Sequence, residues 1–104
     1  MIELDQHHGQ FTLNGELEVD DLPTVASALA KAGTEVQFQL DGLDISDGAA
    51  MAGFTRLLAD VLGSGRRLTL LEPPQLVVHN LYRIGKHPHP LLKVVDMREE
   101  EAYG

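Results

Sequence analysis

The chain has 104 residues, of which 43% are hydrophobic and 5% aromatic, so it is long enough for one domain with a single modest core. Sixteen Asp and Glu against eight Lys and Arg give a net charge of -8, which argues against nucleic acid and anionic membrane surfaces as partners. The lack of cysteine excludes disulfides, thiolate metal sites and a thiol nucleophile, and it suits a reducing cytoplasm.

No targeting or membrane segment is expected. The first residues show no basic region followed by an apolar run, so they do not resemble a secretory signal. The longest nearly uncharged stretch, residues 47–65, is interrupted by Arg56 and Asp60, so it cannot span a bilayer. We therefore expect a cytoplasmic protein that is not inserted in a membrane.

The predicted elements alternate between short strands and helices. Residues 2–4 and 10–13 show the period-two pattern of half-buried strands, joined at His7-His8-Gly9. Three helices are predicted, over residues 22–32, over residues 48–62, and from Pro73-Pro74 to Gly85. Three further strands alternate with them, over residues 35–40, 67–71 and 91–95. Asn14-Gly15 is a competing hairpin signal, which local reasoning leaves open.

The element order β-β-α-β-α-β-α-β predicts an α/β single domain. Helical crossovers favour parallel pairing, whereas the first two strands are directly joined, so we expect a mixed sheet of four to five strands. Polar alternation within the strands favours helices packed mainly on one face. We expect the domain to cover residues 1–96, and residues 97–104, with Glu99 to Glu101, to form an acidic flexible tail.

The residues of the sequence do not assemble an active site or a metal site. His7-His8 and His87-Pro88-His89 are close in sequence, but neighbours on a strand point to opposite faces and a pair around a proline has no fixed geometry. Ser27, Ser46 and Ser64 all lie outside a Gly-x-Ser-x-Gly turn. We expect no catalytic residue, no metal, no cofactor and no enzymatic activity.

Residues 39–54 form the most informative stretch: a strand end, a polar loop and a helix start. Asp47 is the natural N-cap of this helix. Small or flexible residues follow it in the order Gly48-Ala49-Ala50-Met51-Ala52-Gly53. Such residues leave backbone amides open to a protein or an anion, or they let the helix pack closely on the sheet. The local pattern does not decide between these two roles.

The same stretch resembles the STAS family, which includes anti-anti-sigma factors, sulfate-transporter tails and the soluble subunit of a bacterial phospholipid-transport ABC system. The family pattern is Asp-Leu-Ser-Gly-Val at a strand end, then Asp-Ser/Thr-x-Gly-Leu at a helix start; residues 39–43 and 47–51 are similar to these two parts. Residues 13–17, Leu-Asn-Gly-Glu-Leu, resemble the family's Leu-x-Gly-Glu-Leu. The resemblance covers residues 11–95 and implies that Gly15 closes the second strand instead of forming a hairpin.

One departure from the family pattern concerns regulation. In anti-anti-sigma factors a Ser or Thr that is phosphorylated follows the helix-opening Asp, and this chain has Gly48 there. Ser46 is a candidate substitute phosphoacceptor, or it shares the helix cap with Asp47. Asp41, Asp44 and Asp47 predict a negative rim that favours a partner surface rich in Arg or Lys.

The resemblance implies a non-catalytic protein–protein interaction module, an anti-sigma factor antagonist or regulatory adaptor whose partner is an anti-sigma or kinase-like regulator. The alternatives are the soluble STAS subunit of a phospholipid-transport ABC system, bound to its transport ATPase subunit, and a module that senses a nucleotide or acyl ligand. The expected partner-binding residues are Asp44, Ser46, Asp47, Gly48, Ala49, Ala50 and Met51. The polar face of the sheet predicts a monomer or weak homodimer.

Overall fold

The computed structural model describes residues 2–96, so the predicted tail at 97–104 lies outside the described residues. The predicted strands and helices are all present, with small shifts at their ends. In chain order the elements are β1 (Ile2–His7), β2 (Gln10–Glu16), a 3-10 turn (Val19–Asp21), α1 (Leu22–Ala30), β3 (Glu35–Gln39), β4 (Leu43–Asp44), α2 (Gly48–Gly63), β5 (Arg67–Leu71), α3 (Gln75–Arg83) and β6 (Leu92–Val95).

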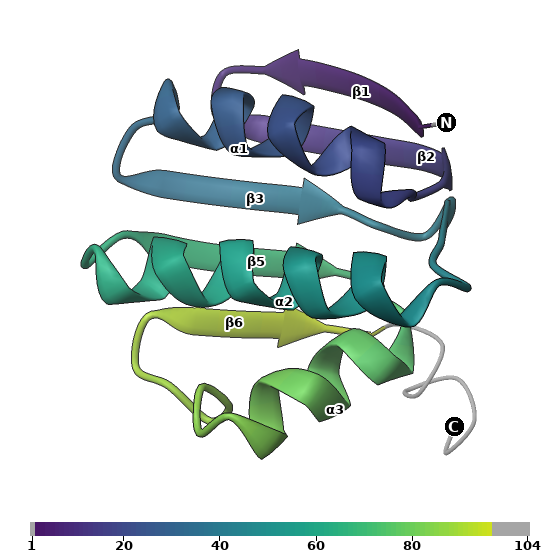
Figure 1. Ribbon diagram of the computed structural model, residues 1–104. Helices are drawn as coiled ribbons and strands as arrows, with labels where there is room; N and C mark the ends of the chain where they lie inside the picture. Colours follow the sequence, from purple (N-terminus) through teal and green to yellow (C-terminus); the bar gives the residue numbers. More distant parts are fainter. Residues whose placement is uncertain (1, 97–104) are drawn as a thin grey trace.

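The sheet is mixed and its helices pack on one face, as predicted. The strand order is β1-β2-β3-β5-β6, with β1 antiparallel to β2 and the other neighbours parallel. Figure 1 shows all three helices on the same side of the sheet, with α2 lying across β5. A sixth strand, β4, exceeds the four or five predicted and pairs with β2. It has two residues, too few to leave a period-two pattern in the sequence.

The first turn lies where the sequence predicted it. His8 and Gly9 connect β1 to β2 and have φ values of 51° and 81°, as a two-residue hairpin of type I′ requires. Asn14-Gly15 does not form a turn. Gly15 pairs with Ile2 of β1 on one side and with Leu43 of β4 on the other, so these two pairings override the local hairpin signal.

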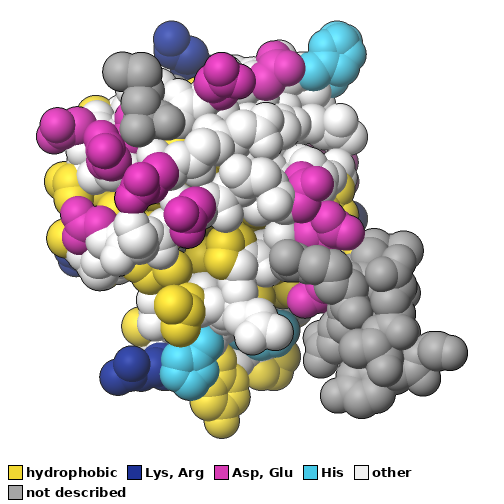
Figure 2. All heavy atoms as spheres, turned by 90° about the vertical axis from the view of Figure 1, so that its right-hand side faces the viewer, with side chains coloured by type: hydrophobic (Ala, Val, Ile, Leu, Met, Phe, Trp, Pro, Cys, Tyr) yellow, Lys and Arg dark blue, Asp and Glu magenta, His cyan; other side chains and the backbone are white. Residues whose placement is uncertain are grey.

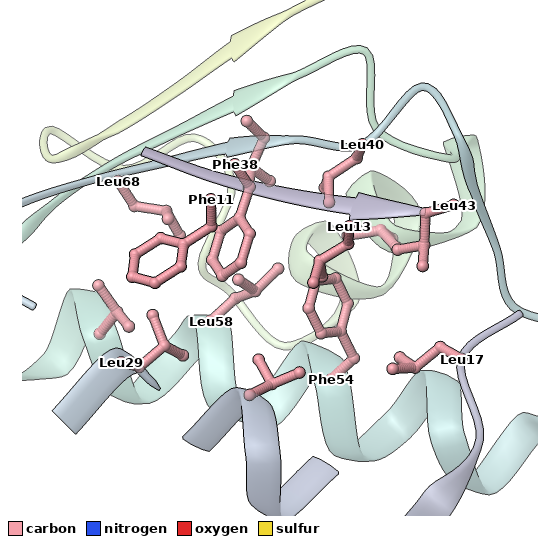
Figure 3. Packing of buried hydrophobic residues seen from close by; sticks show 14 of the residues in the cluster. Phe11, Leu13, Leu17, Leu29, Phe38, Leu40, Leu43, Phe54, Leu58 and Leu68 are labelled. Atoms are coloured by element: carbon pink, nitrogen blue, oxygen red, sulfur yellow. The ribbon is translucent and has the colours of Figure 1, made fainter. Parts of the chain in front are cut away.

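The core forms where the alternating strand residues meet the apolar stripe of α2. Phe11 and Leu13 from β2 and Phe38 from β3 point toward α2, and Phe54 extends from that helix to meet them (Figure 3). The ring of Phe38 lies 5.3 Å from that of Phe11 and 5.8 Å from that of Phe54, centroid to centroid. The second pair has the edge-to-face geometry that aromatic rings favour. This packing fixes α2, and with it the N-terminus of the helix, against the sheet.

The opposite face of the sheet is polar. Gln10, Gln37, Thr69 and Lys93 lie in register across β2, β3, β5 and β6, and all four side chains lie outside the core. A face of this kind provides little apolar area for an obligate interface. Within residues 2–96, no helix has the length and apolar character needed to cross a bilayer.

Candidate functional site

The loop between β3 and α2 is held by its buried apolar residues. Leu43 and Ile45 are buried, whereas Asp44 between them is exposed. Leu43 and Asp44 pair with Gly15 and Glu16 of β2, and the Leu17 N–H donates to the Asp44 carbonyl at 2.8 Å. The alternation of buried and exposed residues thus continues through β4 and presents the Asp44 carboxylate to solvent.

Asp47 caps α2, as the sequence predicted. Its Oδ1 accepts a hydrogen bond from the Ala49 N–H at 2.9 Å, and its carbonyl accepts from the Met51 N–H at 2.9 Å. Asp47 has extended backbone angles, φ -88° and ψ 123°, so it ends the loop and begins the helix. The cap satisfies one of the N–H groups that a helix leaves without an intrahelical partner.

Ser46 ties the loop to the neighbouring strand. Its Oγ donates a hydrogen bond to Oε1 of Glu16 at 2.5 Å, and both side chains are exposed. The two residues are thirty positions apart in the chain, so only the pairing of β4 with β2 brings them together. The bond occupies the hydroxyl that the sequence singled out as a candidate phosphoacceptor, and it sets a carboxylate beside it.

The expectation that Ala50 and Met51 face a partner is wrong. Ala50 is 0% exposed and Met51 is 7% exposed, so both belong to the core. The reason is helical periodicity: the stripe that buries Phe54 one turn later also directs these two side chains inward. Gly48 and Ala49 precede the stripe and are exposed.

The small residues of α2 therefore serve both roles that the sequence left open. A Cβ placed on Gly48 meets nothing within 4 Å, so the helix start is open to solvent. A Cβ placed on Gly53 would meet the side chain of Leu22, so this glycine allows α1 to approach α2 closely. The helix start at Gly48 is thus open, whereas the close approach of α1 occurs at Gly53.

The exposed part of the predicted site consists of Asp44, Ser46, Asp47, Gly48 and Ala49, which we call the docking surface. It lies within a larger group of exposed carboxylates, the acidic face, formed by Glu16, Glu18, Asp20, Asp41, Asp44 and Asp47. Figure 2 looks onto this end of the molecule and shows many Asp and Glu side chains gathered there. Residues 13–22 and 40–51, which include the end of β2, the whole of β4 and the starts of α1 and α2, contain no Lys or Arg.

Sequence reasoning placed three aspartates of this face and missed Glu16, Glu18 and Asp20. They come from the end of β2 and from the connection between β2 and α1, and the pairing of β2 with β4 places that end of β2 beside the site. No pattern within residues 16–20 indicates this neighbour. An acidic cluster of this kind attracts a basic surface and repels other anions.

The histidines that prompted a metal hypothesis lie apart from the docking surface. His7 and His8 are exposed at the β1–β2 turn, and their rings meet edge to face at 4.3 Å. The Nδ1 of His89 accepts a hydrogen bond from the Leu91 N–H at 3.0 Å. In the described part of the chain, no three His, Asp or Glu side chains are grouped so that they could hold a metal ion.

Comparison with known proteins identifies the fold. No family model and no curated protein matches the sequence. Solved structures do match, among them two of SpoIIAA. The Bacillus cell fate determinant SpoIIAA in its phosphorylated form has 14% identity and a TM-score of 0.62, and the match covers 99% of this chain and 98% of that chain. The anti-sigma factor antagonist SpoIIAA in its unphosphorylated form has 15% identity and a TM-score of 0.56, and the match covers 99% of this chain and 95% of that chain. Together with the mixed sheet and its one-sided helices, these matches along nearly the full length of both chains show that this chain has the STAS fold of SpoIIAA.

Proposed function

We propose that this chain is a non-catalytic regulator of the anti-sigma factor antagonist type, which binds a protein partner through the docking surface. The observation that carries the proposal is the exposed, uncluttered start of α2, which follows a loop rich in carboxylates. The likeness to SpoIIAA, an anti-sigma factor antagonist, supports it.

The docking surface is suited to binding because it is already ordered. Leu43 and Ile45 are anchored in the core, Asp47 caps the helix, and Ser46 is bonded to Glu16. A surface that is rigid before binding loses little conformational entropy when a partner arrives. The exposed Gly48 and Ala49 carry no bulky side chain, so a partner can approach the helix backbone closely.

The charge of the acidic face defines the chemistry of the partner. Six exposed carboxylates without an intervening Lys or Arg favour a partner surface that is rich in basic residues. Such complementarity raises the association rate and discriminates against acidic proteins more than it raises affinity. We therefore expect association that slows as the salt concentration rises.

We also propose that binding is constitutive instead of controlled by phosphorylation. SpoIIAA has been solved in a phosphorylated and in an unphosphorylated form. By the family resemblance the acceptor position falls on Gly48, which has no hydroxyl. Ser46 is a poor substitute, because a phosphoryl group on it would add negative charge beside the Glu16 carboxylate that it bonds.

The experiment is affinity capture with two matched arginine variants of α2. Gly48→Arg introduces a bulky cation into the docking surface, and Gly63→Arg introduces the same side chain at the other end of the helix. A Cβ meets no atom within 4 Å at either position, and both glycines are exposed, so both variants are expected to fold. We expect Gly48→Arg to lose a specific partner that the wild type and Gly63→Arg retain.

The outcome also separates the candidate partners. Equal capture by both variants would reject the docking surface. A captured anti-sigma or kinase-like regulator would support the antagonist role, whereas a transport ATPase subunit would assign the chain to a transporter. Stabilisation against heat by nucleotides or acyl ligands, following mass action, would instead favour a ligand-sensing module.

A further inference from the structure

A groove with a volume of about 600 Å³ runs between α2 and α3, and none of its lining residues belongs to the docking surface. Its lining combines apolar and cationic side chains. The apolar part includes Ala52, Ala59 and Ile84, and the cationic part is formed by Arg56, Arg83 and Lys86.

The groove exists because small residues occupy the exposed side of α2. Ala52, Arg56 and Ala59 are separated by four and three positions, so they lie on one face of the helix. On the other wall, Ile84 is 52% exposed, although isoleucine is among the residues most often buried. Three of the four large hydrophobic side chains exposed in the described residues, Leu76, Tyr82 and Ile84, belong to α3 or directly follow it.

The cations of the groove are not paired with any carboxylate of the described residues. Within residues 2–96, the side chains of Arg56, Arg83 and Lys86 form no ion pair. Asp60 is the one carboxylate among the residues that line the groove. In a chain with a net charge of -8, three cations around exposed apolar surface form a local site of the opposite sign. Exposed apolar surface rimmed by charge is typical of protein–protein contacts.

We propose that this groove is a second docking site, and that it binds an acidic amphipathic helix of a partner protein. The bound helix packs apolar side chains against Ala52, Ala59 and Ile84 and directs carboxylates toward the three cations. Residues 52–60 of α2 extend over about 12 Å, the length of two to three helical turns. The site is independent of the docking surface, because the acidic face carries the opposite charge and one partner segment cannot complement both.

No helix within residues 2–96 of a second copy has this character. α1 and α3 contain no carboxylate, and the single carboxylate of α2, Asp60, lines the groove itself. The six carboxylates of the acidic face lie in loops, strand ends and the 3-10 turn, outside all three α-helices. None of the three helices described in residues 2–96 can thus be the occupant, and the proposal assigns the acidic helix to a different protein.

The test uses a synthetic helical peptide that carries Leu along one face and Glu on both sides of it, and a matched peptide with Lys in place of Glu. Binding to the full chain is measured by fluorescence anisotropy, and the contact is mapped by amide chemical shifts. We expect the acidic peptide to bind with the largest shifts near Ala52, Ala59 and Ile84. We expect the lysine peptide to bind at least about tenfold more weakly, which corresponds to about 1.4 kcal/mol.

Charge-reversal variants locate the effect in the groove. The double variant Arg56→Glu with Arg83→Glu is expected to weaken binding of the acidic peptide at least about tenfold. Lys93→Glu makes the same kind of change on the polar face of the sheet and is expected to leave binding within about twofold. All three side chains are exposed, so the variants are expected to keep the fold, which circular dichroism verifies.

Several results would overturn the proposal. These are no binding of the acidic peptide, equal binding of the two peptides, unchanged binding by the double variant, or shifts confined to residues 44–49. A wild-type dimer that the double variant converts to monomers would also overturn it, because a second copy would then be the occupant.

Discussion

Asp47 combines two roles that a pair of substitutions can separate. Its Oδ1 accepts the Ala49 N–H at 2.9 Å and so caps α2, and its charge contributes to the acidic face. Asp47→Ala removes both the cap and the charge. Asp47→Asn removes the charge but keeps an oxygen that can accept the same hydrogen bond. The difference between the two variants therefore reports the cap alone.

The expected difference can be estimated from the cap geometry. Replacing an N-cap Asp by Ala costs about 1 kcal/mol, within a range of about 0.5–2 kcal/mol. In a domain of this size, 1 kcal/mol lowers Tm by roughly 4–8 °C. The Asn variant loses only the attraction between the charge and the helix dipole, about 0.3–1 kcal/mol, and relief of repulsion from neighbouring carboxylates such as Asp44 offsets part of that loss.

The assay combines thermal unfolding with partner capture. We expect Tm to fall in the order wild type, Asn variant, Ala variant, and partner capture to weaken in both variants because both lose the charge. Asp44→Asn is the matched control: it removes a charge from the same face and no side-chain hydrogen bond of Asp44 caps the helix. Equal Tm values for the Asn and Ala variants of Asp47 would refute the capping argument.

Three further predictions test the packing and the site. Phe54→Ala removes a fully buried side chain from the core and should lower the free energy of unfolding by about 3–5 kcal/mol. Urea unfolding measures this loss, and the m-value should not change. A loss below about 1.5 kcal/mol would contradict the packing in Figure 3. A double-mutant cycle of Ser46→Ala and Glu16→Gln should give a coupling of about 0.5–1.5 kcal/mol, whereas additive effects would mean that the hydrogen bond contributes nothing. Gly48→Ser should change the free energy of unfolding by less than about 0.5 kcal/mol, since a side chain at this position meets no neighbour. The new hydroxyl should be phosphorylated by a cognate kinase. Phosphate found by mass spectrometry on Ser46 of the wild type would contradict constitutive binding.

Much of the fold could be predicted from local patterns. In β3, Val36 and Phe38 alternate with polar residues, and in α2 the apolar residues Met51, Phe54 and Leu58 recur every three to four positions. Such patterns indicate which side of each element is buried, because side chains alternate along a strand and share a face of a helix at that spacing. The same stripe already indicated that Met51 and Ala50 face inward. The expectation that they contact a partner gave more weight to their small or flexible side chains than to their place on the helix.

The candidate site was predicted only in part. Asp47 and Gly48 are adjacent in the chain, so a cap followed by an open helix start could be seen in the sequence. Glu16 and Ser46 are thirty residues apart, and their hydrogen bond depends on β4, a strand of two residues without a sequence signal. The acidic face could therefore be predicted at Asp41, Asp44 and Asp47 but not at Glu16, Glu18 and Asp20.

The sequence by itself thus determined the order of elements, the buried face of each and the cap of α2, because these depend on residues within a few positions of one another. Only the tertiary structure decided which distant segments meet. The pairing of β4 with β2 joins residues 16–20 to residues 41–47, and the packing of α3 beside α2 forms the cationic groove. Both depend on contacts between segments far apart in the chain, which local periodicity does not encode.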